Sequence, residues 1–167
     1  LHPRVRRQRQ MCIRDRLYDV GSGTGSIAVE AASLSDDMEV YAIEQKENAV
    51  QLITQNKEKH GLENIHVIKA KAPDGIDTLP VPTHAFIGGS GGNLKEIIEA
   101  LKAKNPHIRI VINAISMETI CEIKEILSAY DVKNEDIVQL QVSRSKQIGH
   151  YHLMQAENPV WICSFEF

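Results

Sequence analysis

A short glycine-rich segment, Asp19–Gly25, has the residue types and spacing of a cofactor-binding turn. It reads Asp-Val-Gly-Ser-Gly-Thr-Gly and lies between a short apolar run and a helical pattern that starts at Ser26. Glycines let a backbone turn tightly and approach a ligand without Cβ clashes. Glu44 ends the next apolar run, 23 residues after Gly21, and its carboxylate can accept hydrogen bonds from a ribose diol. Together, the two features predict a nucleotide-type cofactor site.

Two classes of cofactor compete for this turn. Dinucleotide sites use Gly-x-Gly-x-x-Gly and hold a pyrophosphate on helix amides. The spacing here is Gly-x-Gly-x-Gly, which resembles motif I of class I S-adenosylmethionine-dependent methyltransferases. The acid before the turn suits a cofactor with a cationic sulfonium and an α-amino group, whereas it suits a pyrophosphate poorly. We therefore expect S-adenosyl-L-methionine, with a nicotinamide dinucleotide or a purely structural turn as alternatives. The residues expected to bind the cofactor here are Asp19, Gly21, Ser22, Gly23, Thr24, Gly25 and Glu44.

A second glycine run, Gly88-Gly89-Ser90-Gly91-Gly92, follows the fourth apolar run and precedes a helical pattern with Asn93 as its expected N-cap. The first amides of that helix could receive a carboxylate, and the Ser90 hydroxyl could donate to the same group. Ser90, Gly91 and Gly92 are therefore candidates for a substrate pocket.

The C-terminal region supplies two further candidates, Arg144 and Lys146, in the segment between the last two predicted strands. They could contact an anionic substrate, or they could belong to a solvated hairpin tip. His150 and His152 stand two residues apart, and an ordinary polar loop is favoured over a metal pair. We expect no bound metal and no catalytic dyad, because neither pattern occurs in the sequence.

Short apolar runs alternate with helical periods from Leu17 onward, which predicts an α/β fold with a mostly parallel sheet and helices on both faces. Val138, Leu140 and Val142 alternate with polar residues, as in a half-buried strand. A polar loop at 144–159 would connect this strand to an antiparallel C-terminal strand. The expected architecture is a Rossmann-like, seven-stranded methyltransferase fold. Strands are expected at 17–20, 39–43, 65–69, 84–87, 109–113, 138–142 and 160–167.

Composition bounds the class of protein. Hydrophobic residues make up 43% and charged residues 25%, as in soluble globular domains, and no apolar run approaches the ~20 residues of a membrane helix. Six of the eight arginines lie in residues 1–16, while the remainder is acidic and gives no support for nucleic-acid binding. A basic arm is one interpretation of residues 1–16. We favour a non-native or disordered segment, followed by one domain at 17–167. Three widely spaced cysteines fit a cytoplasmic protein.

A family resemblance extends over nearly the whole of this domain. The chain resembles the cobalt-precorrin C15-methyltransferases (decarboxylating) of cobalamin biosynthesis and the equivalent module of precorrin-6Y C5,15-methyltransferases. The shared motifs are DVGSGTGSIAVEAA at Asp19–Ala32, YAIEQ at Tyr41–Gln45, Ala72-Pro73, FIGGSGGNL at Phe86–Leu94 and NPV at Asn158–Val160.

The resemblance implies a methyl transfer to C15 of a cobalt-precorrin or precorrin tetrapyrrole, with decarboxylation of the C12 acetate. It also implies that the backbone of Ala72 lies against the adenine of S-adenosylmethionine, and that the run Gly88–Gly92 lines the pocket where cofactor and macrocycle meet. Gly88 and Gly89 are therefore expected to bind the cofactor as well. Members often assemble beyond a monomer, so the resemblance allows a homo-oligomer. A methyltransferase acting on another small molecule or RNA, or a non-catalytic module that has lost cofactor binding, are the alternatives.

Two departures from the family pattern bear on the cofactor. Lys71 stands where the family usually has an acidic residue, which would accept a hydrogen bond from the adenine amino group. A lysine cannot accept that bond. Residues 1–16 also lack the Thr-containing segment that contributes to the cofactor site in the family.

Overall fold

The computed structural model describes residues 15–167. The expectations for the basic segment therefore lie largely outside the described residues, although Arg16 is the first residue of β1. The strands are β1 (Arg16–Val20), β2 (Glu39–Glu44), β3 (Ile65–Lys69), β4 (His84–Ile87), β5 (Arg109–Ala114), β6 (Lys133–Leu140), β7 (Ser143–Ile148), β8 (Tyr151–Ala156) and β9 (Val160–Glu166). The helices are α2 (Ser26–Leu34), α3 (Glu47–Lys59), α4 (Leu94–Lys104) and α5 (Met117–Ala129), with a 3-10 turn η1 (Ile76–Thr78).

The main sheet has seven strands in the order β3-β2-β1-β4-β5-β9-β6, which confirms the expected architecture. Strands β1 to β5 are parallel, and β9 lies antiparallel between β5 and β6. After β1 the chain builds outward through β2 and β3, and then returns to place β4 on the other side of β1. This reversal opens a crevice at the carboxyl ends of β1 and β4, where ligands bind in folds of this type.

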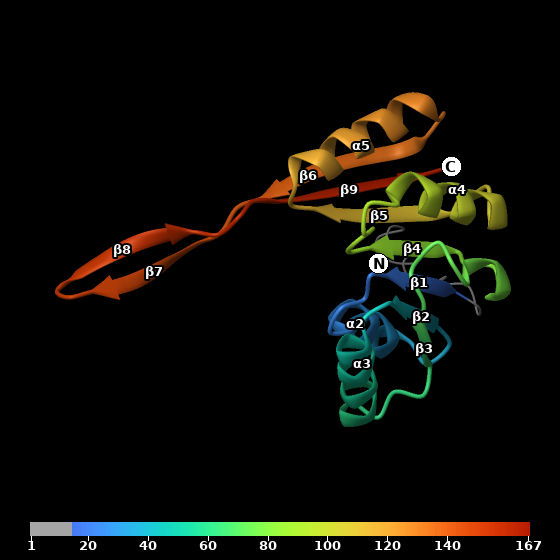
Figure 1. Cartoon of the computed structure of the whole chain (residues 1–167), viewed down its shortest axis with the longest axis horizontal. Helices are drawn as coiled ribbons and strands as arrows, with labels where there is room; N and C mark the ends of the chain where they lie inside the picture. Colours follow the sequence, from blue (N-terminus) through green and yellow to red (C-terminus); the bar gives the residue numbers. More distant parts are fainter. Residues whose placement is uncertain (1–14) are drawn as a thin grey trace, which may run out of the picture.

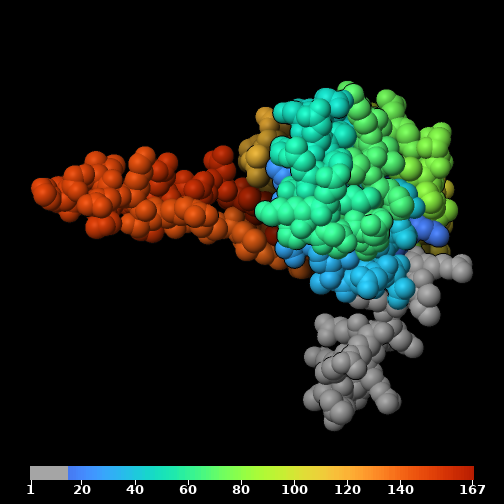
Figure 2. Space-filling view, turned by 90° about the horizontal axis from the view of Figure 1, so that it is seen from below, coloured from blue at the N-terminus to red at the C-terminus, as the bar shows by residue number. Residues whose placement is uncertain are grey.

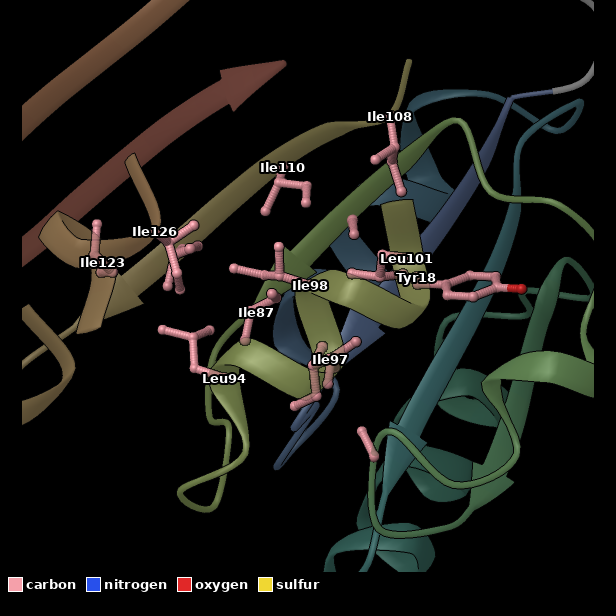
Figure 3. Packing of buried hydrophobic residues seen from close by; sticks show 14 of the residues in the cluster. Tyr18, Ile87, Leu94, Ile97, Ile98, Leu101, Ile108, Ile110, Ile123 and Ile126 are labelled. Atoms are coloured by element: carbon pink, nitrogen blue, oxygen red, sulfur yellow. The ribbon is translucent and has the colours of Figure 1, made fainter. Parts of the chain in front are cut away.

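Helices cover the sheet from both sides (Figure 1). Helix α4 buries Leu94, Ile97, Ile98 and Leu101, the four positions that its 3.6-residue period predicts. They pack against Tyr18 of β1 and against the isoleucines of β4 and β5 (Figure 3). A smaller core on the other face joins α2 and α3 to β2 and β3 around Ile53. The two cores clamp β1 and β2, which fixes the loops at their carboxyl ends.

The C-terminal region differs from the expectation in two ways. Strand β6 spans Lys133–Leu140 rather than 138–142, and all of its residues are exposed rather than half-buried. The physical reason is its place at the sheet edge, where it pairs with β9 alone. The expected polar loop is a two-stranded hairpin, β7–β8, whose residues are also all exposed. It projects from the body as an arm (Figures 1 and 2).

Among residues 15–167, no helix combines the length and the apolar character that crossing a membrane would require.

Candidate active site

Backbone hydrogen bonds fix the loop after β1 to the neighbouring strand β2. The amides of Gly21 and Ser22 both donate to the carbonyl of Ile43 in β2, at 2.9 and 3.2 Å. The Ser22 hydroxyl donates to Asp19 at 2.6 Å, and the Ala28 amide in the first turn of α2 also bonds this carboxylate. Asp19 is almost completely buried, and this burial raises its pKa to about 6 even though both hydrogen bonds favour the charged form. Asp19 thus fastens the loop to the start of α2.

The loop after β1 also touches the glycine run after β4. The amide of Gly88 donates to the carbonyl of Val20 at 2.9 Å. Gly21 has a φ of +69°, and a Cβ placed on it would lie 2.4 Å from the carbonyl oxygen of Gly89. No side chain fits in that space. The motif therefore requires glycine at position 21 for a contact between two loops that are far apart in sequence.

Glu44 joins the first loop to the start of α3. Its carboxylate accepts from the Gly23 amide at 3.0 Å and from the Lys46 amide at 2.9 Å, and the residue is only 7% exposed. Each carboxylate oxygen has further lone pairs, so the group can still accept from a ligand. The acid that the sequence predicted at the end of β2 is therefore rigidly held beside the glycine loop.

A first cavity of about 260 Å³ opens beside these groups. Several predicted cofactor residues line it, namely Gly21, Glu44, Ala72 and Gly89, together with Lys71 and the candidates Ser90 and Gly91. Asn93 stands at the N-cap position of α4, but its side chain does not cap the helix. It donates instead to the carbonyl of Ala72 at 3.3 Å, which ties the cavity wall to α4.

A second cavity of about 220 Å³ shares Gly89, Ser90 and Gly91 with the first. Gly88 and Gly92 from the same glycine run also line this second cavity. Its opposite wall comes from the carboxyl end of β5 and the start of α5, and contains Asn113, Ser116 and Thr119. Ser116 caps α5 by accepting from the Thr119 amide at 3.2 Å. Two adjoining compartments with a common glycine wall can bring the reacting parts of two molecules side by side.

Other predicted residues lie elsewhere. Ser22, Gly23, Thr24 and Gly25 shape the loop and are not among the residues that line either cavity. Arg144 and Lys146 lie on the exposed hairpin arm, and Arg144 is 3.7 Å from the carboxylate of Glu157. Within residues 15–167, no cluster of three or more potential metal ligands is present, and this includes the two histidines of the arm.

Sequence reasoning missed the β5 side of the site, because it assigned no role to Asn113. The only available signal was a polar residue at the carboxyl end of an otherwise apolar core strand.

Strand order, the glycine loop after β1 and the acid at the end of β2 define a Rossmann-like methyltransferase. The family model described as the precorrin methyltransferase domain matches residues 9–166. The chain belongs to this family.

Individual relatives agree with that assignment. The chain is 33% identical to a Salmonella typhimurium protein named cobalt-precorrin-6B C(15)-methyltransferase (decarboxylating), over 87% of this chain and 76% of that protein. A solved precorrin-6y C5,15-methyltransferase from Geobacter metallireducens superposes with a TM-score of 0.81 at 30% identity, over 91% of this chain and 80% of that one. A precorrin 8W decarboxylase from Methanobacterium thermoautotrophicum gives 0.79 at 31% identity, over 98% and 90%. The resemblance found in the sequence is thereby confirmed.

Proposed function

We propose that this protein transfers a methyl group from S-adenosyl-L-methionine to C15 of a cobalt-precorrin or precorrin tetrapyrrole, with decarboxylation of the C12 acetate. The observation that carries the proposal is the pair of adjoining cavities that share Gly89–Gly91, in a chain of the precorrin methyltransferase family. The names of the relatives supply the substrate class.

The residues of the first cavity fit the cofactor. Gly89 lines this cavity, and nothing lies within 4 Å of the point that a Cβ on it would occupy, so a ligand can approach its backbone. Glu44 offers free lone pairs to a ribose diol, and the backbone of Ala72 would lie against the adenine. The bound cofactor supplies an activated methyl group on a sulfonium.

The protein's own contribution is to hold the acceptor carbon near that methyl group and to exclude water. Positioning of this kind supplies several kcal/mol, up to about 7–11 in ideal cases, so the reaction needs no catalytic dyad. Ser90 and the first amides of α4, which begins two residues after Gly92, can bind a carboxylate of the substrate. Decarboxylation would draw on the substrate's own electron sink, with the cavity desolvating the acetate.

Lys71 favours one alternative, a module of this family that no longer binds its cofactor. It lines the first cavity and places an ammonium group where the family usually has an acceptor. A methyltransferase acting on another small molecule or on RNA is a further alternative, which the acidic composition of residues 17–167 disfavours.

The first test is calorimetric titration of the full chain with S-adenosylhomocysteine. We expect binding, with a loss of tenfold or more in affinity for Glu44→Ala. Glu47→Ala is the matched control, since Glu47 is an exposed acid at the first position of α3, three residues after Glu44, and pairs with Lys69. Turnover of a reduced tetrapyrrole then tests the substrate. Cofactor binding without tetrapyrrole turnover would favour another acceptor, and no binding at all would favour the non-catalytic module.

We also propose that the protein is a homo-oligomer that assembles through the arm and β6. A two-stranded hairpin is marginally stable by itself, and here it forms a separate sheet that projects away from the body (Figures 1 and 2). Exposed apolar side chains are concentrated on it and on the adjoining strand, namely Ile137, Val138, Leu140, Val142, Ile148, Tyr151, Leu153 and Met154. Self-complementary antiparallel strands suit a second copy of the same chain. Light scattering should give a mass above that of the monomer, reduced by Leu153→Lys; a monomeric wild type would contradict the proposal.

The absence of nucleic-acid and membrane partners and a cytoplasmic location stay predictions from the sequence.

A further inference from the structure

Asn113 has a buried side-chain oxygen without a hydrogen-bond partner. Of the buried side-chain nitrogen and oxygen atoms described in residues 15–167, its Oδ1 is the one that no group bonds. The residue is the last but one of β5 and lies opposite Ile162 of β9 in the register of the sheet. A folded protein gains nothing from such a group, because its water is lost and not replaced.

Other asparagines of the fold show how the chain normally satisfies this side chain. The amide of Asn64 donates to three backbone carbonyls at 2.9–3.2 Å. Asn105 donates to the carbonyl of Pro82 at 2.9 Å and accepts from the amide of His107 at 2.9 Å. Both are structural residues. Asn113 makes no comparable bond within the described chain, so stability does not explain its presence.

The surroundings of Asn113 point to a ligand. It lines the second cavity, whose wall contains no charged side chain. The hydroxyls of Ser116 and Thr119 in the same wall are already used, since they bond each other at 3.0 Å and cap α5. Asn113 is not among the residues that line the first cavity, where the cofactor is proposed to bind. As placed, Oδ1 is buried, but no hydrogen bond holds the amide group, so rotation about the Cβ–Cγ bond can turn this oxygen toward the second reactant in the cavity.

We propose that Asn113 is a substrate-binding residue, whose side-chain oxygen accepts a hydrogen bond from an N–H or O–H group of the acceptor bound in the second cavity. The inference rests on the proposed function. In an uncharged cavity a neutral acceptor discriminates strongly, because a ligand without the donor leaves the oxygen unpaired. For a tetrapyrrole the donor is a ring N–H or the O–H of a carboxylic acid.

The test compares Asn113→Leu with Asn105→Leu, the same substitution at a satisfied asparagine. For Asn113→Leu we expect an unchanged or raised melting temperature, an affinity for S-adenosylhomocysteine within twofold of wild type, and a KM for the tetrapyrrole raised about tenfold with a smaller change in kcat. For Asn105→Leu we expect the reverse, a lower melting temperature with an unchanged KM.

Comparison of metal-free and cobalt-containing substrates identifies the donor. A KM effect confined to the metal-free ring assigns a ring N–H, since cobalt occupies those nitrogens, whereas an equal effect on both assigns a carboxylic acid. The inference is overturned if Asn113→Leu melts as low as Asn105→Leu, if its KM is unchanged, or if cofactor affinity falls tenfold, which would assign the donor to the cofactor. Wild-type protein that binds S-adenosylhomocysteine but turns over neither tetrapyrrole overturns the proposed function first, and this inference with it.

Discussion

The glycine-lined edge of the sheet and the hairpin arm are opposites in how the chain is held. At the edge, the loops after β1 and β4 are rich in glycine and contain few large side chains, yet both are fixed by hydrogen bonds to other strands or loops, as at Gly21, Gly23 and Gly88. Along the arm, Ser143–Ala156, large side chains are abundant, but the backbone pairs only with itself. The edge therefore has few large side chains but many hydrogen bonds to the rest of the fold, whereas the arm has many large side chains but, within residues 15–167, no such bonds along its strands.

The difference fits what we propose that each region binds, a small-molecule cofactor at the edge and a second copy of the chain at the arm. A small-molecule site needs the backbone close to the ligand, so glycine replaces side chains and hydrogen bonds replace packing. A protein–protein contact needs exposed apolar area, and packing arrives only with the partner. Both regions lie on the same side of the molecule, because β6 runs in the direction of β5 and ends at the carboxyl edge.

The largest effect on stability and cofactor binding is expected for Gly21→Ala, which changes the contact between the loops after β1 and β4. The new Cβ would lie 2.4 Å from the carbonyl oxygen of Gly89, and alanine disfavours the φ of +69°. We expect a loss of about 3 kcal/mol in the free energy of unfolding, measured with urea, and no detectable binding of S-adenosylhomocysteine by calorimetry.

Gly61→Ala separates the clash from the backbone strain. Gly61 has a similar φ of +63°, but nothing lies within 4 Å of the point that an alanine Cβ would occupy. The expected cost is about 1 kcal/mol, with cofactor affinity unchanged. Equal effects at the two glycines would show that the contact between the loops is unimportant.

Asp19 makes the stability of the edge dependent on pH. Burial raises its pKa from 3.8 to about 6, so the folded protein binds this proton more tightly than the unfolded chain. The contribution to stability is complete below about pH 4 and is lost as the pH rises through 6. Relative to Asp19→Asn, wild type should lose about 2–3 kcal/mol between pH 4 and pH 7 in urea unfolding. A difference that stays constant over this range would mean that the carboxylate is charged throughout.

Lys71→Asp should strengthen cofactor binding at the same edge. Lys71 lines the first cavity, and a carboxylate there can accept from an amino group where the ammonium cannot. We expect affinity for S-adenosylhomocysteine to rise about tenfold in calorimetry, equivalent to about 1.4 kcal/mol. Lys124→Asp makes the same charge change on α5, away from both cavities, and should leave affinity unchanged. If the two variants bind alike, Lys71 does not limit the cofactor site.

The sequence predicts the glycine-lined edge better than it predicts the arm. The edge depends on short segments of fixed spacing, so Gly21, Glu44 and the run at Gly88–Gly92 are enough to locate the crevice from the residues alone. The role of Asn113 could not be predicted from the sequence, because its missing hydrogen-bond partner results from packing between β5, β9 and the following loop. No local pattern records that absence.

The arm could not be predicted from the sequence for a different reason. Alternation at Val138, Leu140 and Val142 correctly indicates that a strand has one apolar face, but it does not say which chain covers that face. The prediction of a half-buried strand assumed cover from the same chain. The turn at Gly149 and the pairing of Ile148 with Tyr151 were also hidden in a segment that looked like a polar loop.

Removal of the arm should have the smallest effect on the edge. The carbonyl of Val142 accepts from the Glu157 amide at 2.8 Å, so an Asn-Gly turn can join these two residues in place of 143–156. The shortened protein should bind S-adenosylhomocysteine within twofold of the full chain in calorimetry, while light scattering shows a monomer. The two regions would then act independently, one for the cofactor and one for assembly. A tenfold loss of affinity would instead make the arm part of the site, with Arg144 and Lys146 as the residues to test next.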